Sequence, residues 1–489
     1  MSTFSHTLIF IMLHAFLSAQ PVKPGFDRDE CRKLLAVSAA TVTNPAYAGK
    51  LPYPERFEKV YEGKVTALGN SWDLWMDEGA VAAVSIRGAA LPPDISPENF
   101  FAPMLPAAGE ITLDTAGAVF RYRLADDPRA AVHAGWLIGT ALLSQEIVPQ
   151  VTALCDGGVR DLLITGHGEG GAMAYLLTAH LLRLRESGDL PADLRIKTYC
   201  TAAPKPGNPG FAHSFEAATR DGYAFNVVNA NDPVPQMPLT VQTLEDFTAG
   251  NPFSRTQEGL GENQFPQRRI PKRSHRKLSK PLLKARNNYR RHLSDPTLTD
   301  ITKKLPGLQL PPTESTAHYV RTGHTVTLLP DAAYRKKFGD RSDSVFVHHL
   351  HAPYFHLLDA TYYTPEEIAA REEKSPFFGS PTWVLIGIDG FPAESMKQED
   401  PPTLRVEEET GLVKGFGGCN EFSAKAVRKG KEINIGPVAA SRKHCGKKNI
   451  ENAYLPALEG VFRIEVKDNF LRMKRSDGKL LTFIKAPAE

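Results

Sequence analysis

The stretch that decides the fold runs from Asp161 to Leu177 and reads DLLITGHGEGGAMAYLL. It begins with a short apolar run, continues through a turn with four glycines, and ends in an apolar pattern of helical spacing. A short apolar run bounded by glycine is typical of a buried strand, and apolar residues repeating every three or four positions mark one face of a helix. The stretch therefore predicts a buried strand, a tight turn and a helix.

The turn has two interpretations. Gly166, Gly168 and Gly171 satisfy the G-x-G-x-x-G pattern, whose glycines let a backbone approach a pyrophosphate at a helix N-terminus. That pattern alone would indicate a nucleotide-binding protein. The next strand-like run, LRIKTYC at 194–200, supplies no carboxylate for a ribose, so the pattern has no second support.

The other interpretation is a nucleophile elbow of the G-x-S-x-G type, with Gly168 at the serine position. Such an elbow is a strained reversal from strand to helix, and glycine accepts positive φ at little cost. Glycine at this position is therefore expected to relieve the strain and to remove the nucleophile.

Short apolar runs alternate with amphipathic stretches between Val81 and Asp232. This alternation predicts an α/β fold with a parallel sheet covered by helices on both faces. Ligands of such sheets bind where the strands end and the turns begin.

Five segments resemble, in the same chain order, motifs of the class 3 (fungal-type) lipases. They are AAVSIRGAA (82–90), VHAGW (132–136), TAAPKPGNPGFA (201–212), VVNANDPVPQMP (227–238) and HAPYF (351–355). They are similar to the family's FRGT-type strand end, H-x-G-F helix start, P-x-x-G-N-x-x-F segment, V-N-x-x-D-x-V-P segment and late H-x-x-Y-F. The resemblance spans about 300 residues and implies an α/β-hydrolase fold with a parallel-rich sheet. It also implies hydrolysis of a carboxylic ester through an acyl-enzyme, with no cofactor and no metal.

Carried over residue by residue, the resemblance implies that Asp232 is the triad acid and His351 the general base. The nucleophile position falls on Gly168, which has no side chain. The two oxyanion donors become the backbone N–H groups of Ala89 and Glu169, and Ala89 lacks the hydroxyl that the family has there. Loss of one oxyanion donor costs about 10²- to 10³-fold in rate, whereas loss of a triad serine costs about 10⁶-fold.

The carboxyl-terminal part is a series of short strands with glycine and Asp-Gly turns, and it includes one helix-like stretch, NIENAYLPALEGV at 449–461. SDGK at 476–479, between two apolar runs, predicts a hairpin. VKGFGGCNEFSAKAV (413–427) and INIGPVAASRKHC (433–445) resemble the META domain, a small secreted or periplasmic bacterial module. We therefore expect a mostly antiparallel β domain with one helix and no catalytic constellation. Its partner is not indicated.

The length of 489 residues favours two or three domains. A charged fraction of 23% and a net charge of +3 are ordinary for a globular protein. The predicted organisation consists of a signal peptide at 1–20, a lipase-like domain at 24–370, a linker at 371–380 and a META-like domain at 381–489.

The amino terminus carries an apolar run from Leu8 to Leu17, followed by small residues up to Ala19. This pattern predicts a secretory signal peptide cleaved near Ala19 or Gln20, and so a secreted or periplasmic protein. The odd number of cysteines leaves at least one thiol free or paired between chains. For Cys419 and Cys445 two possibilities stay open, a disulfide or two buried thiols.

The segment 263–294 contains eleven Lys or Arg residues and no Asp or Glu. Its main interpretation is a solvated helical insertion, and contact with an anionic lipid or glycan surface is the alternative. Few aromatic residues interrupt the basic ones, so nucleic acid is not an expected partner.

The sequence thus predicts a secreted class 3 lipase-like protein whose ligand is a lipid, an ester or a partner, and whose site is impaired by Gly168. The alternative is an active lipase or carboxylesterase in which His351 and Asp232 activate water. Nucleotide binding through residues 166–171 is the third hypothesis.

Overall fold

The structure is a computed structural model. It describes residues 22–42, 47, 51–52, 54, 57–77, 81–88, 97–248, 251, 272–339, 346–372, 382–391, 400–407, 410–429, 432–441, 443, 450–467 and 470–486. The predicted signal peptide, Ala89, most of the predicted linker and Cys445 lie outside the described residues.

A seven-stranded sheet forms the centre of the amino-terminal domain, in the order β1-β2-β3-β8-β9-β10-β11. Its first two strands are antiparallel and the remaining pairs, from β3 to β11, are parallel. The strands are β1 (Phe57–Glu62), β2 (Ser71–Asp77), β3 (Val81–Arg87), β8 (Asp161–His167), β9 (Arg195–Thr201), β10 (Ala224–Asn229) and β11 (His324–Leu328). The predicted parallel-rich sheet is confirmed.

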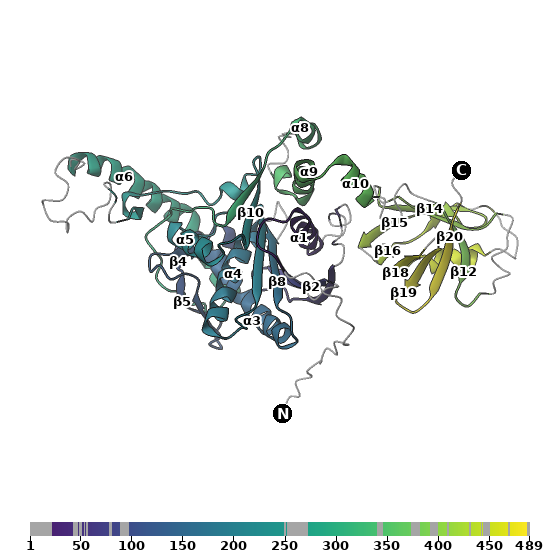
Figure 1. The fold of residues 1–489 in the computed structure, drawn as a ribbon, viewed down its shortest axis with the longest axis horizontal. Helices are drawn as coiled ribbons and strands as arrows, with labels where there is room; N and C mark the ends of the chain where they lie inside the picture. The colour runs from purple at the N-terminus through teal and green to yellow at the C-terminus, as the bar shows by residue number, and fades with distance from the viewer. Residues whose placement is uncertain are drawn as a thin grey trace, which may run out of the picture.

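Helices cover both faces of this sheet (Figure 1). Successive strand residues point to opposite faces, so Leu162 and Ile164 of β8 pack in one core and Leu163 packs in the other. The first core is completed by α3 (Ala134–Asp156), α4 (Glu169–Ser187) and α5 (Pro209–Ala218). The second is completed by α1 (Arg28–Ala40), α8 (Ala332–Phe338) and α9 (His351–Tyr362).

Two further antiparallel sheets of two strands each extend the domain. β4 (Met104–Pro106) pairs with β7 (Ala131–His133), and β5 (Ala108–Thr112) pairs with β6 (Val119–Arg123). The short helix α10 (Pro365–Glu372) follows α9. Both the β5–β6 pair and α4 contribute to the first core, so this side of the domain is one packed unit.

The basic segment is helical where it is described. α6 (Lys272–Tyr289) continues through a π-helical turn (Arg290–Ser294) into α7 (Asp295–Lys304). In Figure 1, α6 extends away from the body of the domain. Within the described part of the chain, no helix has the length and apolarity of a membrane span.

The carboxyl-terminal domain is a nine-stranded antiparallel sheet, and a pairing of β14 with β15 closes it into a barrel. The strands are β12 (Thr382–Ile388), β13 (Thr403–Glu407), β14 (Leu412–Phe416), β15 (Glu421–Lys429), β16 (Glu432–Ile435), β17 (Ala439–Ala440), β18 (Gly460–Lys467), β19 (Phe470–Arg475) and β20 (Leu480–Lys485). One helix, α11 (Glu451–Ala457), packs on the barrel core through Tyr454. The predicted hairpin at SDGK joins β19 to β20.

Candidate functional site

Gly168 lies at the turn between β8 and α4, as the sequence predicts. Its φ of 58° and ψ of −124° form a conformation that side chains rarely adopt. The following turn is tight as well, because a Cβ on Gly170 would lie 2.1 Å from the carbonyl oxygen of Ile86. The elbow geometry is therefore present, and its central residue is a glycine.

A histidine and an aspartate face this elbow. Asp232 follows β10 and is 1% exposed, and its Oδ2 lies 2.9 Å from Nδ1 of His349. The carboxylate can only accept, so Nδ1 of His349 carries the proton and Nε2 presents its lone pair. A Cβ built on Gly168 would lie 2.6 Å from that Nε2. The imidazole thus lies against the place where a nucleophile side chain would begin.

Two further donors hold the carboxylate of Asp232. The hydroxyl of Tyr354 donates to Oδ2 at 2.7 Å, and the backbone N–H of Val234 donates to Oδ1 at 2.9 Å. These hydrogen bonds fix the orientation of the carboxylate toward His349. The sequence interpretation did not include Tyr354 in this role.

The structure differs from the sequence prediction at His351, because the histidine that contacts Asp232 is His349. His351 is the first residue of α9, and its Nε2 lies 3.2 Å from Oγ of Ser38 on α1. Its Nδ1 lies 2.8 Å from the hydroxyl of Tyr47. Burial, and secondarily His349, lower the pKa of His351 to about 3, so it is a neutral core residue.

The ring of His167 contacts both of these histidines. Its ring centroid lies 4.0 Å from that of His351 and 5.0 Å from that of His349. Its Nε2 donates to the carbonyl oxygen of His349 at 2.6 Å, and its Nδ1 lies 2.7 Å from Oγ1 of Thr201. Burial holds the pKa of His167 well below its ordinary value, as do both neighbouring histidines. The ring is thus a support that positions the backbone of His349.

Glu169, the first residue of α4, directs its carboxylate toward the end of β3. A Cβ on Gly88 would lie 2.7 Å from Oε2 of Glu169. The side-chain amide of Asn70 donates to Oε1 of Glu169 at 3.2 Å and to Oε1 of buried Glu98 at 2.6 Å. Gly88 directly precedes Ala89, the predicted oxyanion residue, which lies outside the described residues. A carboxylate therefore lies beside the region where the oxyanion hole was expected.

The remaining motif residues are structural. His133 caps α3 by accepting from the backbone N–H of Trp136, and burial lowers its pKa to about 3. Arg87 donates through Nε to Oγ of Ser71 at 2.9 Å. Oδ1 of Asn208 accepts the N–H of Phe211 at 3.1 Å at the start of α5. None of these three contacts involves the elbow.

The nucleotide-binding interpretation finds no support in this geometry. A pyrophosphate would need the N-terminus of α4, and His349 lies against Gly168 at that point. Across the described ranges, no group of three or more His, Cys, Asp or Glu side chains has an arrangement that would hold a metal ion.

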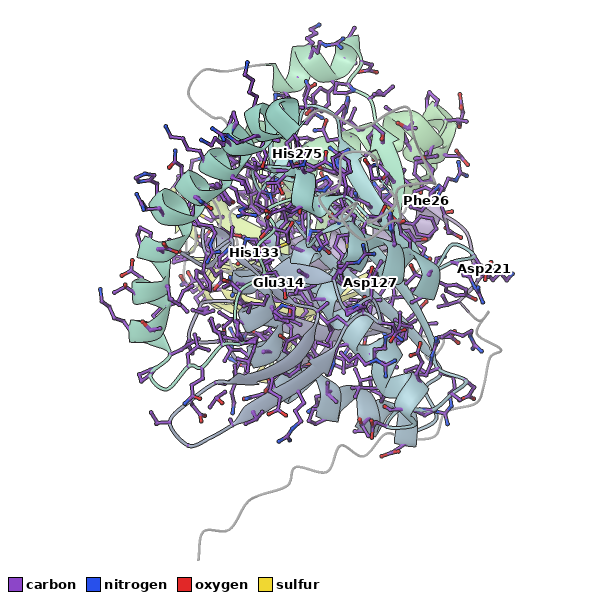
Figure 2. The ribbon with its side chains drawn as sticks, turned by 90° about the vertical axis from the view of Figure 1, so that its left-hand side faces the viewer. Phe26, Asp127, His133, Asp221, His275 and Glu314 are labelled. Carbon is purple, nitrogen blue, oxygen red and sulfur yellow. The ribbon has the colours of Figure 1, made fainter. Side chains whose placement is uncertain are left out.

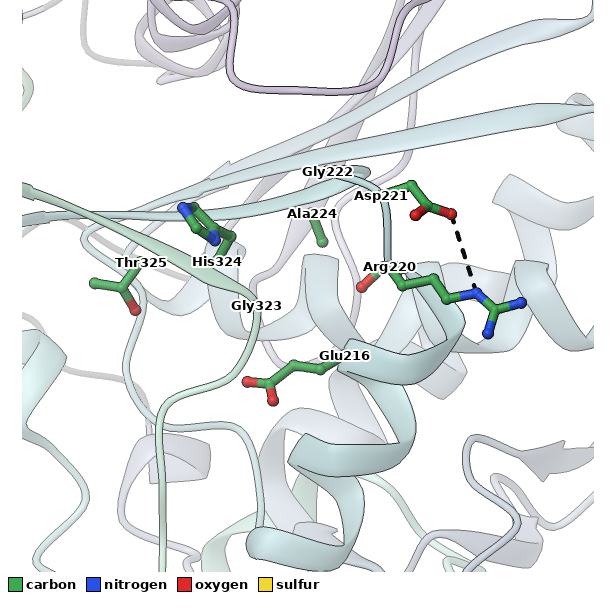
Figure 3. Close-up of a pocket in the computed structure, with 9 residues that line it drawn as sticks. Glu216, Arg220, Asp221, Gly222, Ala224, Gly323, His324 and Thr325 are labelled. Carbon is green, nitrogen blue, oxygen red and sulfur yellow. Dashed lines mark ion pairs between the residues drawn. The ribbon is translucent and has the colours of Figure 1, made fainter.

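A hollow of about 410 Å³ lies at the opposite edge of the sheet, where β10 and β11 begin (Figure 3). Its lining is polar and includes Glu216, Arg220, Asp221 and His324. Since β10 is a strand of six residues, this hollow is roughly 20 Å from the elbow end. It is separate from Gly168, Asp232 and His349.

The sequence contains a signal for the start of α9, although not for the histidine that faces Asp232. Pro353 is the third residue of α9, and proline in a first helical turn marks a helix start nearby. His351 is the first residue of the helix, and His349 lies two residues upstream, in the short 3-10 helix Val347–His349. The resemblance selects His351 instead, through its spacing from Tyr354 and Phe355.

The fold and this arrangement define a protein of the α/β-hydrolase type, with a histidine–aspartate pair at a nucleophile elbow. Residues 107–242 match the family model "Lipase (class 3)", and residues 378–488 match the model "META domain". The chain is thus similar to class 3 lipases over residues 107–242 and to META domains over residues 378–488.

Solved structures similar to this chain include lipases of fungi. The Lip2 lipase from Yarrowia lipolytica is 18% identical, with 45% of this chain and 79% of that chain covered and a TM-score of 0.34. A lipase from Rhizopus microsporus var. chinensis is 17% identical, with 48% and 80% covered and a TM-score of 0.31. A protein from Burkholderia xenovorans is 24% identical, with 22% and 83% covered and a TM-score of 0.20. A search of curated proteins finds no match.

Proposed function

We propose that this protein binds a lipid or another carboxylic ester at the elbow end of the sheet and has lost the covalent step of ester hydrolysis. The observation that carries the proposal is Gly168, which lies where a nucleophile would stand and has no hydroxyl to offer the Nε2 of His349. The class 3 lipase domain supports the choice of ligand. The side chain of His349 is 14% exposed, so the pair remains reachable from solvent.

The order of events in acyl transfer explains why this loss is decisive. The base must take a proton from a hydroxyl as the oxygen attacks the ester carbonyl, and the same oxygen then carries the acyl group. With glycine, no atom of residue 168 attacks or carries the acyl group. His349 and Asp232 remain as a polarised pair that can hydrogen-bond to a bound ester.

Glu169 opposes the reaction independently. The tetrahedral intermediate places a negative charge on the former carbonyl oxygen, and donors beside it lower the barrier. In the family this charge develops near the residues that correspond to Ala89 and Glu169. A carboxylate beside Gly88 destabilises such an oxyanion by like-charge repulsion, which is strong where water is scarce.

Hydrolysis by water is the second candidate function. It is favoured by one observation, the correctly oriented hydrogen bond from His349 to Asp232 at 2.9 Å, which leaves Nε2 able to accept a proton. In this route a water molecule replaces the serine hydroxyl and attacks the ester in a single step, without an acyl-enzyme.

The test is hydrolysis of a short-chain p-nitrophenyl ester by the parent, by Gly168→Ser and by Gly168→Ala. Alanine adds the same Cβ without the hydroxyl and is the matched control. We expect turnover only with serine, and a further gain of about 10- to 100-fold in Gly168→Ser combined with Glu169→Gln, because the opposing charge is removed.

Two outcomes contradict the proposal. Turnover by the parent that disappears in His349→Ala would establish the water route. Failure of every folded variant to hydrolyse any ester would show that the elbow end is not an ester site.

We also propose that the protein acts outside the cytoplasm. The apolar run from Leu8 to Leu17 supports this location. Cys419 is disulfide-bonded, which is typical of oxidising compartments, whereas Cys31, Cys155 and Cys200 are free and buried. Fractionation of cells that express the full chain, with sequencing of the mature amino terminus, tests this location.

A further inference from the structure

The basic helix α6 has two faces of different character. One face contains residues spaced by four, three, four and three positions that are buried or half-buried: His275, Ser279, Leu282, Arg286 and Tyr289. At 3.6 residues per turn this spacing follows one side of the helix. This is the side by which α6 is attached to the domain.

The attachment involves segments near the elbow end of the sheet. Tyr289 packs against Ala102 and Ala317, with Val241 beside them. Arg286 pairs with Glu245 at 3.1 Å. Val241 and Glu245 belong to the segment that follows Asp232, so the helix and the candidate site share a supporting segment.

The opposite face is cationic. Arg276, Lys280 and Lys284 follow one another at four-residue spacing, and Lys277 lies two turns before Lys284. These four positions fall roughly 100° to 200° around the helix from His275. All four side chains are exposed. Figure 2 looks onto this end of the molecule, with His275 labelled, and shows long side chains that extend outward from the helix.

The described part of the chain supplies no ion-pair partner for these four cations. Among the described residues none of them makes an ion pair, whereas the neighbouring Arg286 does. α6 itself contains no Asp or Glu. An uncompensated row of cations on one helix face attracts an anionic surface and is costly to keep together without one.

A row of exposed Lys and Arg side chains is attracted to the negative surface potential of anionic phospholipids, at about 1 kcal/mol for each cation near the surface. The exposed apolar side chain of α6, Leu278, is 49% exposed and lies roughly 300° around the helix from His275, next to the attached face. The cations therefore carry the binding. A polyanion such as a nucleic acid would instead favour exposed aromatic residues, and Tyr289, the one Phe, Tyr or Trp of α6, is buried.

We propose that the exposed face of α6 binds the surface of a membrane that contains anionic phospholipids. Arg276, Lys277, Lys280 and Lys284 contact the headgroups. The attachment near Asp232 then brings the elbow end of the sheet close to lipid. The inference does not require an ester at Gly168, because the cationic face is separate from the elbow.

The experiment is sedimentation of the full chain with vesicles of phosphatidylcholine that contain phosphatidylglycerol, and with vesicles of phosphatidylcholine alone. We expect binding only to the anionic vesicles at low ionic strength, with loss of binding at about 1 M salt. Replacement of Arg276, Lys277, Lys280 and Lys284 by Gln is expected to weaken binding about 10²- to 10³-fold.

The matched control removes the same number and kind of cations from the barrel, with Lys425, Arg472, Lys474 and Lys479 replaced by Gln. These side chains are exposed, and none of them makes an ion pair among the described residues. We expect the control to bind within about threefold of the parent, because only the local charge of α6 should matter. Thermal unfolding by circular dichroism checks that both variants are folded.

Three results would overturn the proposal. In the first, the parent does not bind anionic vesicles at low salt. In the second, the α6 variant binds as well as the barrel variant. In the third, the parent binds soluble heparin more tightly than it binds anionic vesicles at the same ionic strength, which would identify a soluble polyanion as the partner. Gly168→Ser should leave vesicle binding unchanged, so that failure here is distinguishable from failure of the ester site.

Discussion

His349 and His351 both contact His167 and have different surroundings. His349 contacts the carboxylate of Asp232, and its Nε2 faces Gly168. His351 has both ring nitrogens near hydroxyl groups, those of Tyr47 and Ser38, and is 3% exposed. Two residues of separation in the sequence therefore give one histidine oriented for proton transfer and one that stabilises the packing of α1 on α9.

The comparison shows what makes a histidine a base. The imidazole needs a carboxylate on one nitrogen to fix the tautomer, and a free lone pair on the other that faces the reacting atom. A histidine whose two nitrogens are both engaged by core hydroxyls satisfies neither condition, even if it matches the motif spacing. The following predictions test this difference in order of decreasing effect.

The largest expected effect is on rate, in a Gly168→Ser background. Addition of His349→Ala should reduce ester turnover by at least about 10⁴-fold, because the serine then has no base. Addition of His351→Gln should leave turnover within about tenfold, because that ring does not reach the elbow. The measurement is kcat/KM for a p-nitrophenyl ester. The reverse pattern would restore His351 as the base.

The next effect concerns stability and its dependence on pH. Burial lowers the pKa of His351 to about 3, against about 6.5 in an unfolded chain. The folded state therefore binds fewer protons between these values, and stability is fully present above about pH 6.5 and is lost as pH falls toward 3. The contribution changes by about 1.4 kcal/mol per pH unit in this window.

The measurement for His351 is urea unfolding of the parent and of His351→Gln at pH 7.5 and at pH 5. The variant should be less stable by about 2–4 kcal/mol at the higher pH, since Ser38 and Tyr47 lose their partner. The difference should shrink by roughly 2 kcal/mol at pH 5. Other buried histidines, such as His133, affect both proteins equally. An equal difference at the two pH values would contradict the assignment.

The smallest effect is the strain at Gly168. Serine at φ 58° and ψ −124° should lower stability by about 1–3 kcal/mol, and the midpoint of thermal unfolding by several degrees. Gly188 is the control, because it has φ 87° in the ordinary left-handed region and nothing within 4 Å of a built Cβ. Gly188→Ser should cost less. A Gly168→Ser protein that melts at or above the parent temperature would show that the elbow is not strained.

Much of the fold could be predicted from the sequence. The run DLLITG followed by GGAMAYLL gives β8 and α4 because periodicity reports which residues are buried and glycine reports where the chain turns. The SDGK turn and the alternation around it likewise predicted a hairpin of the barrel. Gly168 and Asp232 lie shortly after β8 and β10, and their roles in a site stay predictions.

The identity of the histidine could not be predicted in the same way. The run VHHLHAPYFH at 347–356 offers four histidines. Local patterns do not say which ring turns toward a residue more than a hundred positions away. The contacts of Glu169 with Asn70 and with the end of β3 were equally inaccessible, since they join segments far apart in the chain.

By itself the sequence determined the strand–turn–helix at Gly168, the absence of a nucleophilic side chain there, the order of the two domains and the concentration of positive charge at 263–294. These are local properties, fixed by side-chain chemistry and backbone freedom. Only the tertiary structure decided that His349 meets Asp232, that His351 is buried against α1, and that the cations of α6 share one exposed face. Those outcomes depend on packing between segments that are distant in the sequence. Such packing places residues that are close in the sequence, such as His349 and His351, in different environments.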